Sequence, residues 1–243
     1  MTSPARLMDI NGITVELVRK PIKNLHIRLY PPDGSRVLVS APKRMSLAAV
    51  RQAVVDSLDW IRKHQQKLST RPQPPPPSYG TGDPHYFLGS CLRLAVHLHH
   101  GRPAVVQRHG TLELRVPPDT PVAYRASLLN EWYRSQLKAM IPDLLAQWQQ
   151  IVGVQVAAWG VKRMKTRWGT CNPRARRIWL NLELAKRPLH CLEYVIVHEL
   201  VHLLEQSHNA RFTGFMDRFM PLWRQHREEL RQPQHGQSCE WDA

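Results

Sequence analysis

Apolar and polar residues alternate along three short segments near the start of the chain, with the period of two that is typical of half-buried β-strands. These segments are residues 13–18, 25–30 and 36–40. A turn sequence at residues 31–34 separates the second segment from the third. From Ser46, a favourable N-cap, apolar residues recur at helical spacing as far as Lys67. The pattern therefore predicts three strands and one helix within residues 1–70.

A proline-rich segment at residues 71–84 interrupts this pattern and predicts a stiff, extended connector. Short apolar stretches between glycines then predict further strands at residues 86–88, 92–98, 104–108 and 111–116. Together these strands would make residues 85–120 a β-rich segment, in which turns at the glycines separate one strand from the next.

Helical spacing dominates the C-terminal half of the chain. Apolar residues recur from residue 122 to residue 152 and predict a long helix, which Pro142 should kink or split. Three extended segments follow, at residues 154–159, 164–171 and 178–182, and the last two should form a hairpin. An apolar helix begins near Leu189, directly after the hairpin. We expect residues 121–232 to form one domain and residues 233–243 to be a loose tail.

The candidate chemistry lies on this apolar helix, which contains the sequence His-Glu-Leu-Val-His at residues 198–202. Residues four apart lie one turn apart on the same face of a helix, so His198 and His202 can bind one metal ion. Glu199 then lies beside the pair, where it can act as general base for a zinc-activated water. His208 follows His198 by ten residues and could be a third ligand. A chance match to the five-residue motif is expected only about 0.03 times in a chain of this composition.

These histidines could instead be surface or core residues that bind no metal. The residues around them argue against that alternative, because they are apolar almost all round the helix: Leu189, Leu192, Val195, Ile196, Leu200, Leu203 and Leu204. Burying two imidazoles and a carboxylate there without partners would cost several kcal/mol. A bound ion beside a water-filled cleft removes this cost, and we expect one Zn²⁺ per chain.

The distribution of charge suggests a partner. The 243-residue chain carries 34 Lys and Arg against 19 Asp and Glu, a net charge of +15. The stretch Lys162–Arg187 holds nine basic residues and one acidic residue, whereas residues 188–243 carry five basic and eight acidic residues. Basic surface beside a hydrolytic centre suggests an anionic partner such as a nucleic acid or a nucleotide. A solvated basic face without a partner is the alternative.

Neither a signal-peptide core nor an apolar run of membrane-spanning length is found in the sequence, so we expect no membrane partner. The four cysteines are widely separated and form no Cys-x-x-Cys pair. A cytoplasmic location fits these features best. Cys171 and Cys191 lie near the candidate site in sequence, and we expect packing thiols there in preference to metal ligands.

Three segments of the chain carry a resemblance to a known family: Arg167–Asn172, Ile178–Asn181, and Tyr194–His202 with His208. They resemble the YgjP-like family of zincin-type metallopeptidases, which is related to the SprT-like and WLM metalloproteases. The resemblance is dense from Trp159 to Trp223 and weaker towards the N-terminus. It implies an α+β protein, with an N-terminal β-rich region and a helix followed by a zincin-like unit. In that unit, helices including the His-Glu-x-x-His helix should pack on a small antiparallel sheet.

The resemblance also implies roles for particular residues. The metal ligands would be His198, His202 and His208, with Glu199 as the base. Glu205 stands where metzincins have glycine, which argues against a metzincin turn. An edge strand beside the metal helix would align an extended peptide, and residues 164–171 or 178–182 would supply that edge. Candidate substrate contacts are Arg167, Trp168, Asn172 and Tyr194, although Trp168 could simply pack the hairpin.

Zinc-dependent hydrolysis of a protein or peptide is the function that this reading favours. A metal-dependent nucleotide pyrophosphatase acting on UTP-type substrates is an alternative that the resemblance also allows. The sequence has no P-loop and no acidic cluster for Mg²⁺, which argues against that alternative. A nucleic-acid-associated protease or DNA-binding module is a further alternative, for which DNA affinity should fall steeply with salt.

Overall fold

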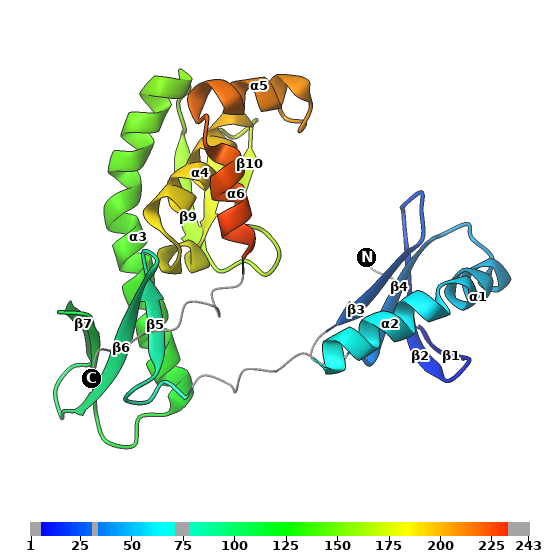
Figure 1. Cartoon of the computed structure of the whole chain (residues 1–243), viewed down its shortest axis with the longest axis horizontal. Helices are drawn as coiled ribbons and strands as arrows, with labels where there is room; N and C mark the ends of the chain where they lie inside the picture. The colour runs from blue at the N-terminus through cyan, green and yellow to red at the C-terminus, as the bar shows by residue number, and fades with distance from the viewer. Residues whose placement is uncertain (1–5, 31–33, 71–77, 233–243) are drawn as a thin grey trace. The chain divides into compact units, whose positions relative to one another are not determined.

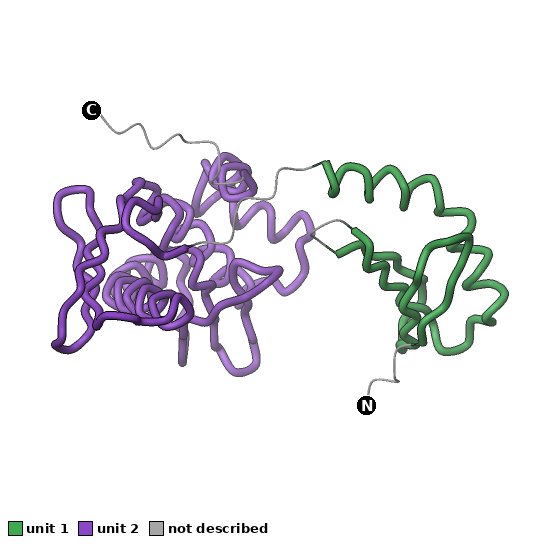
Figure 2. Tube along the Cα trace, turned by 90° about the horizontal axis from the view of Figure 1, so that it is seen from below, with its two compact units in different colours: residues 1–76 green, residues 77–243 purple. Residues whose placement is uncertain are grey.

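The computed structural model describes residues 6–30, 34–70 and 78–232 and confirms the α+β class. The chain divides into two compact units, Met1–Pro76 and Pro77–Ala243 (Figure 2). Residues 31–33 of the predicted turn, residues 71–77 of the predicted connector and the predicted C-terminal tail lie outside the described residues.

The first unit contains a four-stranded sheet in the order β1-β2-β4-β3. The strands are β1 (Arg6–Ile10), β2 (Ile13–Lys20), β3 (His26–Tyr30) and β4 (Arg36–Pro42). The three predicted strands are present, and β1 is an additional strand that pairs antiparallel with β2. Asn11 and Gly12, both with positive φ, form the tight turn between them. Strands β2 and β4 pair in parallel and form the centre of the sheet.

Two helices, α1 (Leu47–Asp56) and α2 (Leu58–Ser69), replace the single helix predicted after Ser46. Ser46 caps α1 as expected, accepting a hydrogen bond from the amide of Ala49. The break falls at Ser57, whose amide donates to Val54 and whose hydroxyl donates to the carbonyl of Ala53. The core of this unit contains fully buried residues from both the helices and the sheet: Val15, Val37, Val39, Val50, Val54 and Ile61.

The second unit contains two sheets. The first has the order β5-β6-β8-β7, with β5 (Pro84–Phe87), β6 (Ser90–Leu98), β7 (Ala104–Arg108) and β8 (Thr111–Val116). The second has the order β10-β11-β9, with β9 (Ala158–Lys162), β10 (Gly169–Asn172) and β11 (Arg177–Asn181). The predicted hairpin is β10–β11, but β11 also pairs in parallel with β9, so this small sheet is mixed instead of antiparallel. Strand β10 is therefore an edge, whereas β11, the other predicted edge, is central.

The helices of this unit are α3 (Val122–Val152), α4 (Leu189–Val201), α5 (Ala210–Phe219) and α6 (Trp223–Arg231), together with a 3₁₀ turn, η1 (Leu182–Lys186). Figure 1 shows α4 between the long helix α3 and α6, both of which it contacts. Helix α3 continues through Pro142, which does not split it. Buried side chains on both sides of the proline, Leu137, Ile141 and Leu145, hold the helix against the core.

One hydrophobic core extends through the whole second unit. It includes Leu94 and Leu114 of the first sheet, Leu180 of the second sheet and Val197 of α4. The segments 85–120 and 121–232 therefore share a core.

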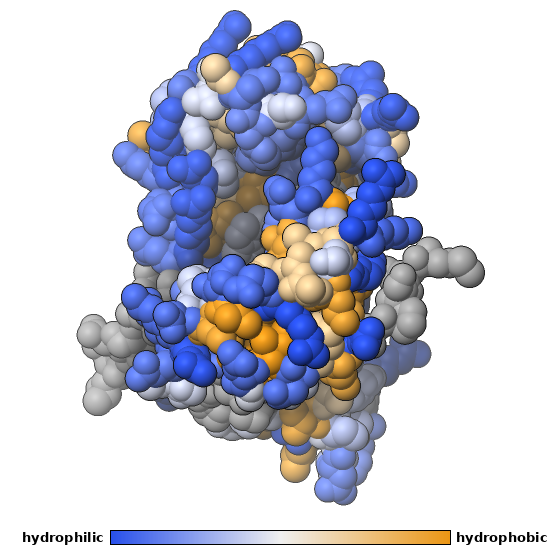
Figure 3. Space-filling view, turned by 90° about the vertical axis from the view of Figure 1, so that its right-hand side faces the viewer, coloured by the Kyte–Doolittle hydropathy of each residue, from blue (hydrophilic) through white to orange (hydrophobic). Residues whose placement is uncertain are grey.

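The face of the molecule in Figure 3 is mostly hydrophilic. Among the described residues, no helix combines the length and apolar character needed to cross a bilayer.

Candidate metal centre

Helix α4 places the candidate residues at its C-terminal end. Most of the helix is buried, because it lies in the core between α3, α6 and the small sheet. Glu199 belongs to the buried stretch and is only 4% exposed. The helix ends at His202, whose amide still donates to the carbonyl of His198. His198 and His202 are therefore one turn apart, as the spacing predicts.

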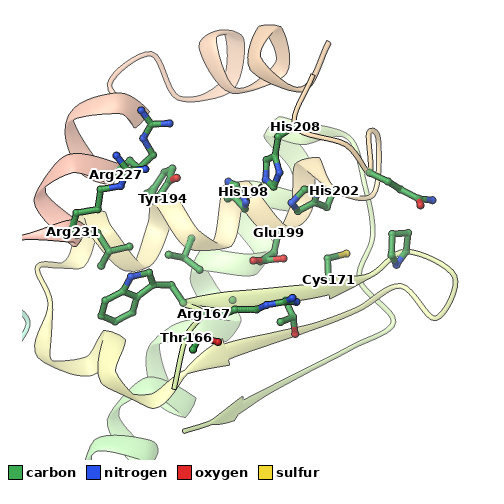
Figure 4. A pocket seen from close by; sticks show the side chains of 17 residues that line it. Thr166, Arg167, Cys171, Tyr194, His198, Glu199, His202, His208, Arg227 and Arg231 are labelled. Atoms are coloured by element: carbon green, nitrogen blue, oxygen red, sulfur yellow. Dashed lines mark hydrogen bonds between the residues drawn. The ribbon is translucent and has the colours of Figure 1, made fainter. Parts of the chain in front are cut away.

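Three histidines converge beyond this end of α4. His208 comes from the loop between α4 and α5, and its Nε2 lies 3.1 Å from Nε2 of His198. One ring nitrogen from each of His198, His202 and His208 lies within 4.8 Å of the other two. Figure 4 shows the three side chains pointing towards one another at the mouth of a pocket. His208, which lies outside the helix, thus joins His198 and His202, which the helix aligns.

The loop between His202 and His208 orients the second histidine. Nδ1 of His202 lies 3.1 Å from the backbone carbonyl of Glu205 and can donate to it, which leaves Nε2 free to bind a metal. The Glu205 carboxylate accepts a hydrogen bond from the amide of Ser207, which holds the loop. Glu205 is not among the described residues with positive φ, so this loop does not need the glycine of a metzincin turn.

Phe212 forms an apolar wall behind the histidines. Its ring centroid lies 5.0 Å from that of His198, 4.8 Å from that of His202 and 4.7 Å from that of His208. Asn209 fixes its position by capping α5, accepting a hydrogen bond from the amide of Phe212. Phe212 is not among the candidate site residues that the sequence predicts. Its contact with all three histidines depends on the course of the loop, which spacing does not reveal.

Glu199 points from α4 towards the edge strand β10 (Figure 4). A Cβ atom added to Gly169 would lie only 2.4 Å from Oε1 of Glu199, so only glycine fits at the start of β10. Burial raises the pKa of Glu199 to about 8, and the nearby Arg167 guanidinium partly opposes this shift. With this pKa, the carboxyl group can gain or lose a proton near neutral pH. Additional positive charge beside it would act in the same direction as Arg167 and favour the ionised form.

The electrostatic environment keeps His198 and His202 in the neutral form that binds metals. Burial, followed by the neighbouring His202 and His208, lowers the pKa of His198 to about 3. The pKa of His202 is also lowered, mainly by burial. Nδ1 of His198 is buried without a hydrogen-bond partner among the described residues. Three converging imidazoles are a donor set for a divalent metal such as zinc, and the residues present fit such an ion.

A pocket of about 660 Å³ opens beside the histidines. Three of the four predicted substrate contacts line it, namely Arg167, Trp168 and Tyr194. The Tyr194 ring lies 5.8 Å from the His198 ring and stacks on Trp223. The structure does not bring Asn172 to the pocket. Its side-chain oxygen accepts a hydrogen bond from Ala175 and so stabilises the β10–β11 turn.

Asn181 holds the segment that carries Arg167, a role that the sequence did not reveal. The side chain is 4% exposed, and its amide nitrogen donates to the carbonyls of Met164 and Arg167 at 3.0 and 2.8 Å. Its oxygen accepts from the amides of Met164 and Glu183. This network curls residues 164–168 around Asn181, which is why β10 begins only at Gly169 and not at Met164 as predicted.

Two further arginines of the pocket, Arg227 and Arg231, come from α6 (Figure 4). Sequence reasoning missed them because they lie far from the histidine motif and approach it only through the packing of α6 on α4. Of the nine basic residues in the stretch Lys162–Arg187, only Arg167 lines this pocket. Other members have partners within the chain: Arg163 and Lys186 both pair with Glu183. The anionic partner predicted for this stretch stays a prediction.

Both Cys171 and Cys191 are free thiols, and neither belongs to the group of histidine ligands. Burial raises the pKa of each thiol to about 11. Cys171 lines the pocket, and Cys191 is buried in the core. Protonated, partly or fully buried thiols act as packing groups, as expected for both residues.

Comparison with known proteins gives one family match. A model described as "YgjP-like, metallopeptidase domain" matches residues 25–233. A crystal structure of the metallopeptidase zymogen abylysin of Pyrococcus abyssi is similar at 20% identity, over 37% of this chain and 91% of that chain, with a TM-score of 0.35. No curated protein matches the chain. The assignment therefore rests on the family model, which covers most of the chain.

Proposed function

The chain belongs to the YgjP-like family, and we propose that it is a zinc-dependent metallopeptidase in which Glu199 is the general base. His198, His202 and His208 would hold the ion, since their ring nitrogens converge. Bound zinc supplies positive charge that polarises a peptide carbonyl and acidifies a water molecule. The observation that carries the proposal is the position of Glu199, which is buried between the histidines and the start of β10.

Glu199 performs the proton transfers of this reaction. Its carboxylate takes a proton from the water that attacks the peptide carbonyl and gives it to the nitrogen of the leaving amine as the C–N bond breaks. Burial raises the pKa of this group to about 8, so it holds the proton well between the two transfers. Arg167 keeps the pKa from rising further, which favours the ionised form that must begin the cycle.

Strand β10 would bind the substrate main chain. Among the described strands it pairs only with β11, so its other edge can pair with an extended peptide. Backbone hydrogen bonds to such an edge hold many sequences in one register. Gly169, at the start of this edge, touches Glu199, so a peptide bound there would pass close to the base.

The test combines zinc content with cleavage of a casein-like protein, in the unchanged chain and in Glu199→Gln. We expect about one zinc at the histidine site of both proteins and cleavage only by the unchanged chain, because glutamine preserves the shape but not the basicity. Glu131→Gln is the matched control, since Glu131 is an exposed residue of α3 that pairs with Arg134. A Glu199→Gln protein that still cleaves casein at the normal rate would disprove the role of the base.

A nucleotide pyrophosphatase is a second candidate that one observation favours. Arg167, Arg227 and Arg231 line the same pocket, and three guanidinium groups suit a triphosphate. If nucleotides are the substrate, the chain should release pyrophosphate from UTP, and Arg227→Gln should raise KM for UTP. Casein cleavage without any release of pyrophosphate would eliminate this candidate.

A further inference from the structure

We propose that His190, His226 and Glu229 form a second divalent-metal site, separate from the histidine site of the proposed function. One ligand atom from each residue lies within 4.8 Å of the other two, and all three side chains are partly buried. None of the three lines the pocket. We name this group the interhelix cluster, because it joins the first turn of α4 to α6.

The geometry follows from two helices that pack together. His226 and Glu229 are three residues apart on α6, so they lie on one face of that helix and both face the start of α4. Nε2 of His190 lies 2.5 Å from a carboxylate oxygen of Glu229, and the rings of His190 and His226 are 4.7 Å apart. The cluster thus brings two imidazoles to one carboxylate from two different helices.

The donor set suits a transition-metal ion of the zinc class. Two imidazoles and one carboxylate are a common zinc-binding set, and a water molecule would complete a tetrahedral site. The side chains of His190 and Glu229 are both 43% exposed, so an ion from solvent can reach them. A hydrogen-bonded His190–Glu229 pair without metal is the alternative. It engages two of the three residues, whereas a metal ion would also engage the ring of His226.

The consequence of such a site is the anchoring of α6. Only Trp223 and Leu230 of its nine residues are buried, which is little apolar surface for holding a helix in place. Arg227 and Arg231 lie on the neighbouring face of the same helix and line the pocket. A metal in the interhelix cluster would therefore fix the wall of the pocket that carries these two arginines. Its role is positioning, not catalysis.

The experiment isolates the second site by removing the first. In a His198→Ala/His202→Ala variant of the full chain, equilibrated with micromolar zinc and desalted, we expect one zinc per chain and a higher unfolding temperature than after zinc removal. Adding His226→Ala should abolish both the bound zinc and the zinc-dependent rise in unfolding temperature. Gln225→Ala, at the adjacent exposed position of α6, is the matched control and should change neither.

A folded double variant that binds no zinc would overturn the proposal, as would zinc that remains bound after His226→Ala. If the double variant does not fold, the same question is answered in the otherwise unchanged chain. There we expect two zinc ions per chain and one after His226→Ala, with normal folding. An equal zinc content in these two proteins would be equally decisive against the site. One zinc per chain that disappears with His226→Ala would mean that the histidine site binds none, which would count against the proposed function instead.

Discussion

The two ends of α4 carry similar residues arranged in different ways. At the C-terminal end, the histidines converge without a carboxylate among them, and Glu199 is buried beside them, facing the edge strand. At the N-terminal end, the carboxylate of Glu229 lies within the interhelix cluster itself and is partly exposed. A carboxylate outside the ligand group is free to move protons, whereas one inside it can only bind the ion. The position of the acid, more than the number of histidines, therefore separates a candidate catalytic centre from a candidate structural one.

The largest effect should come from comparing one ligand at each end. His202→Ala should reduce kcat/KM for a peptide by at least about a hundredfold, because the metal that polarises the carbonyl is lost. His226→Ala should reduce it by less than about tenfold, because it only loosens the wall formed by α6. Steady-state kinetics on the same substrate will measure both. Equal losses in the two variants would show that the two ends have the same role.

A smaller effect concerns the stability of the metal-free protein. The pKa of Glu199 is about 8 in the fold against 4.5 for an unperturbed group, so the folded state retains a proton that the unfolded state has lost. Stability should therefore fall as the pH rises from about 4.5 to 8 and stay low above that range. Glu199→Gln removes this fall, and at pH 8 it should raise the unfolding temperature by about 4 °C or more.

Thermal unfolding of the metal-free proteins at pH 5 and pH 8 measures this difference. The stabilisation by Glu199→Gln should be small at pH 5 and large at pH 8. Glu131→Gln, the exposed control on α3, should show no such growth. The prediction fails if Glu199→Gln stabilises the protein equally at both pH values.

The smallest effect is a shift in the pH profile. The Arg167 guanidinium lowers the pKa of Glu199, so Arg167→Gln should raise that pKa and move the acidic limb of kcat/KM to higher pH. Because Arg167 is exposed, a shift of about 0.5 unit is expected, which is about a threefold loss on the acidic side and little loss above pH 9. Arg163→Gln is the control, since Arg163 pairs with Glu183 outside the pocket. A loss that is the same at every pH would assign Arg167 to substrate binding.

The sequence predicted best the features that depend on local geometry. The alignment of His198 with His202 follows from helical spacing alone. The alternating segments located β2, β3 and β4, and the extended segments located the β10–β11 hairpin. Features that depend on packing were missed or wrong. The break at Ser57, the continuation of α3 through Pro142 and the curl around Asn181 all reflect hydrogen bonds or core contacts made by distant residues.

The same distinction holds within the candidate site. Glu199 and the histidines of α4 could be identified because one turn of helix brings them together. Arg227, Arg231 and Phe212 could not, because α5 and α6 reach the pocket through packing that leaves no periodic signal in the sequence. Asn172 was a candidate because the resemblance includes the segment Arg167–Asn172, but its side chain serves the turn.

The loop that joins His202 to His208 orients His202 through its main chain, because the Glu205 carbonyl faces the ring of His202. A backbone carbonyl is supplied by any amino acid, so the orientation of His202 does not depend on which side chain stands at position 205. The number of residues in the loop is a stricter requirement, because one insertion or deletion would displace His208 from its partners. Among natural and engineered variants, we therefore expect the length of this loop to be kept more strictly than its composition.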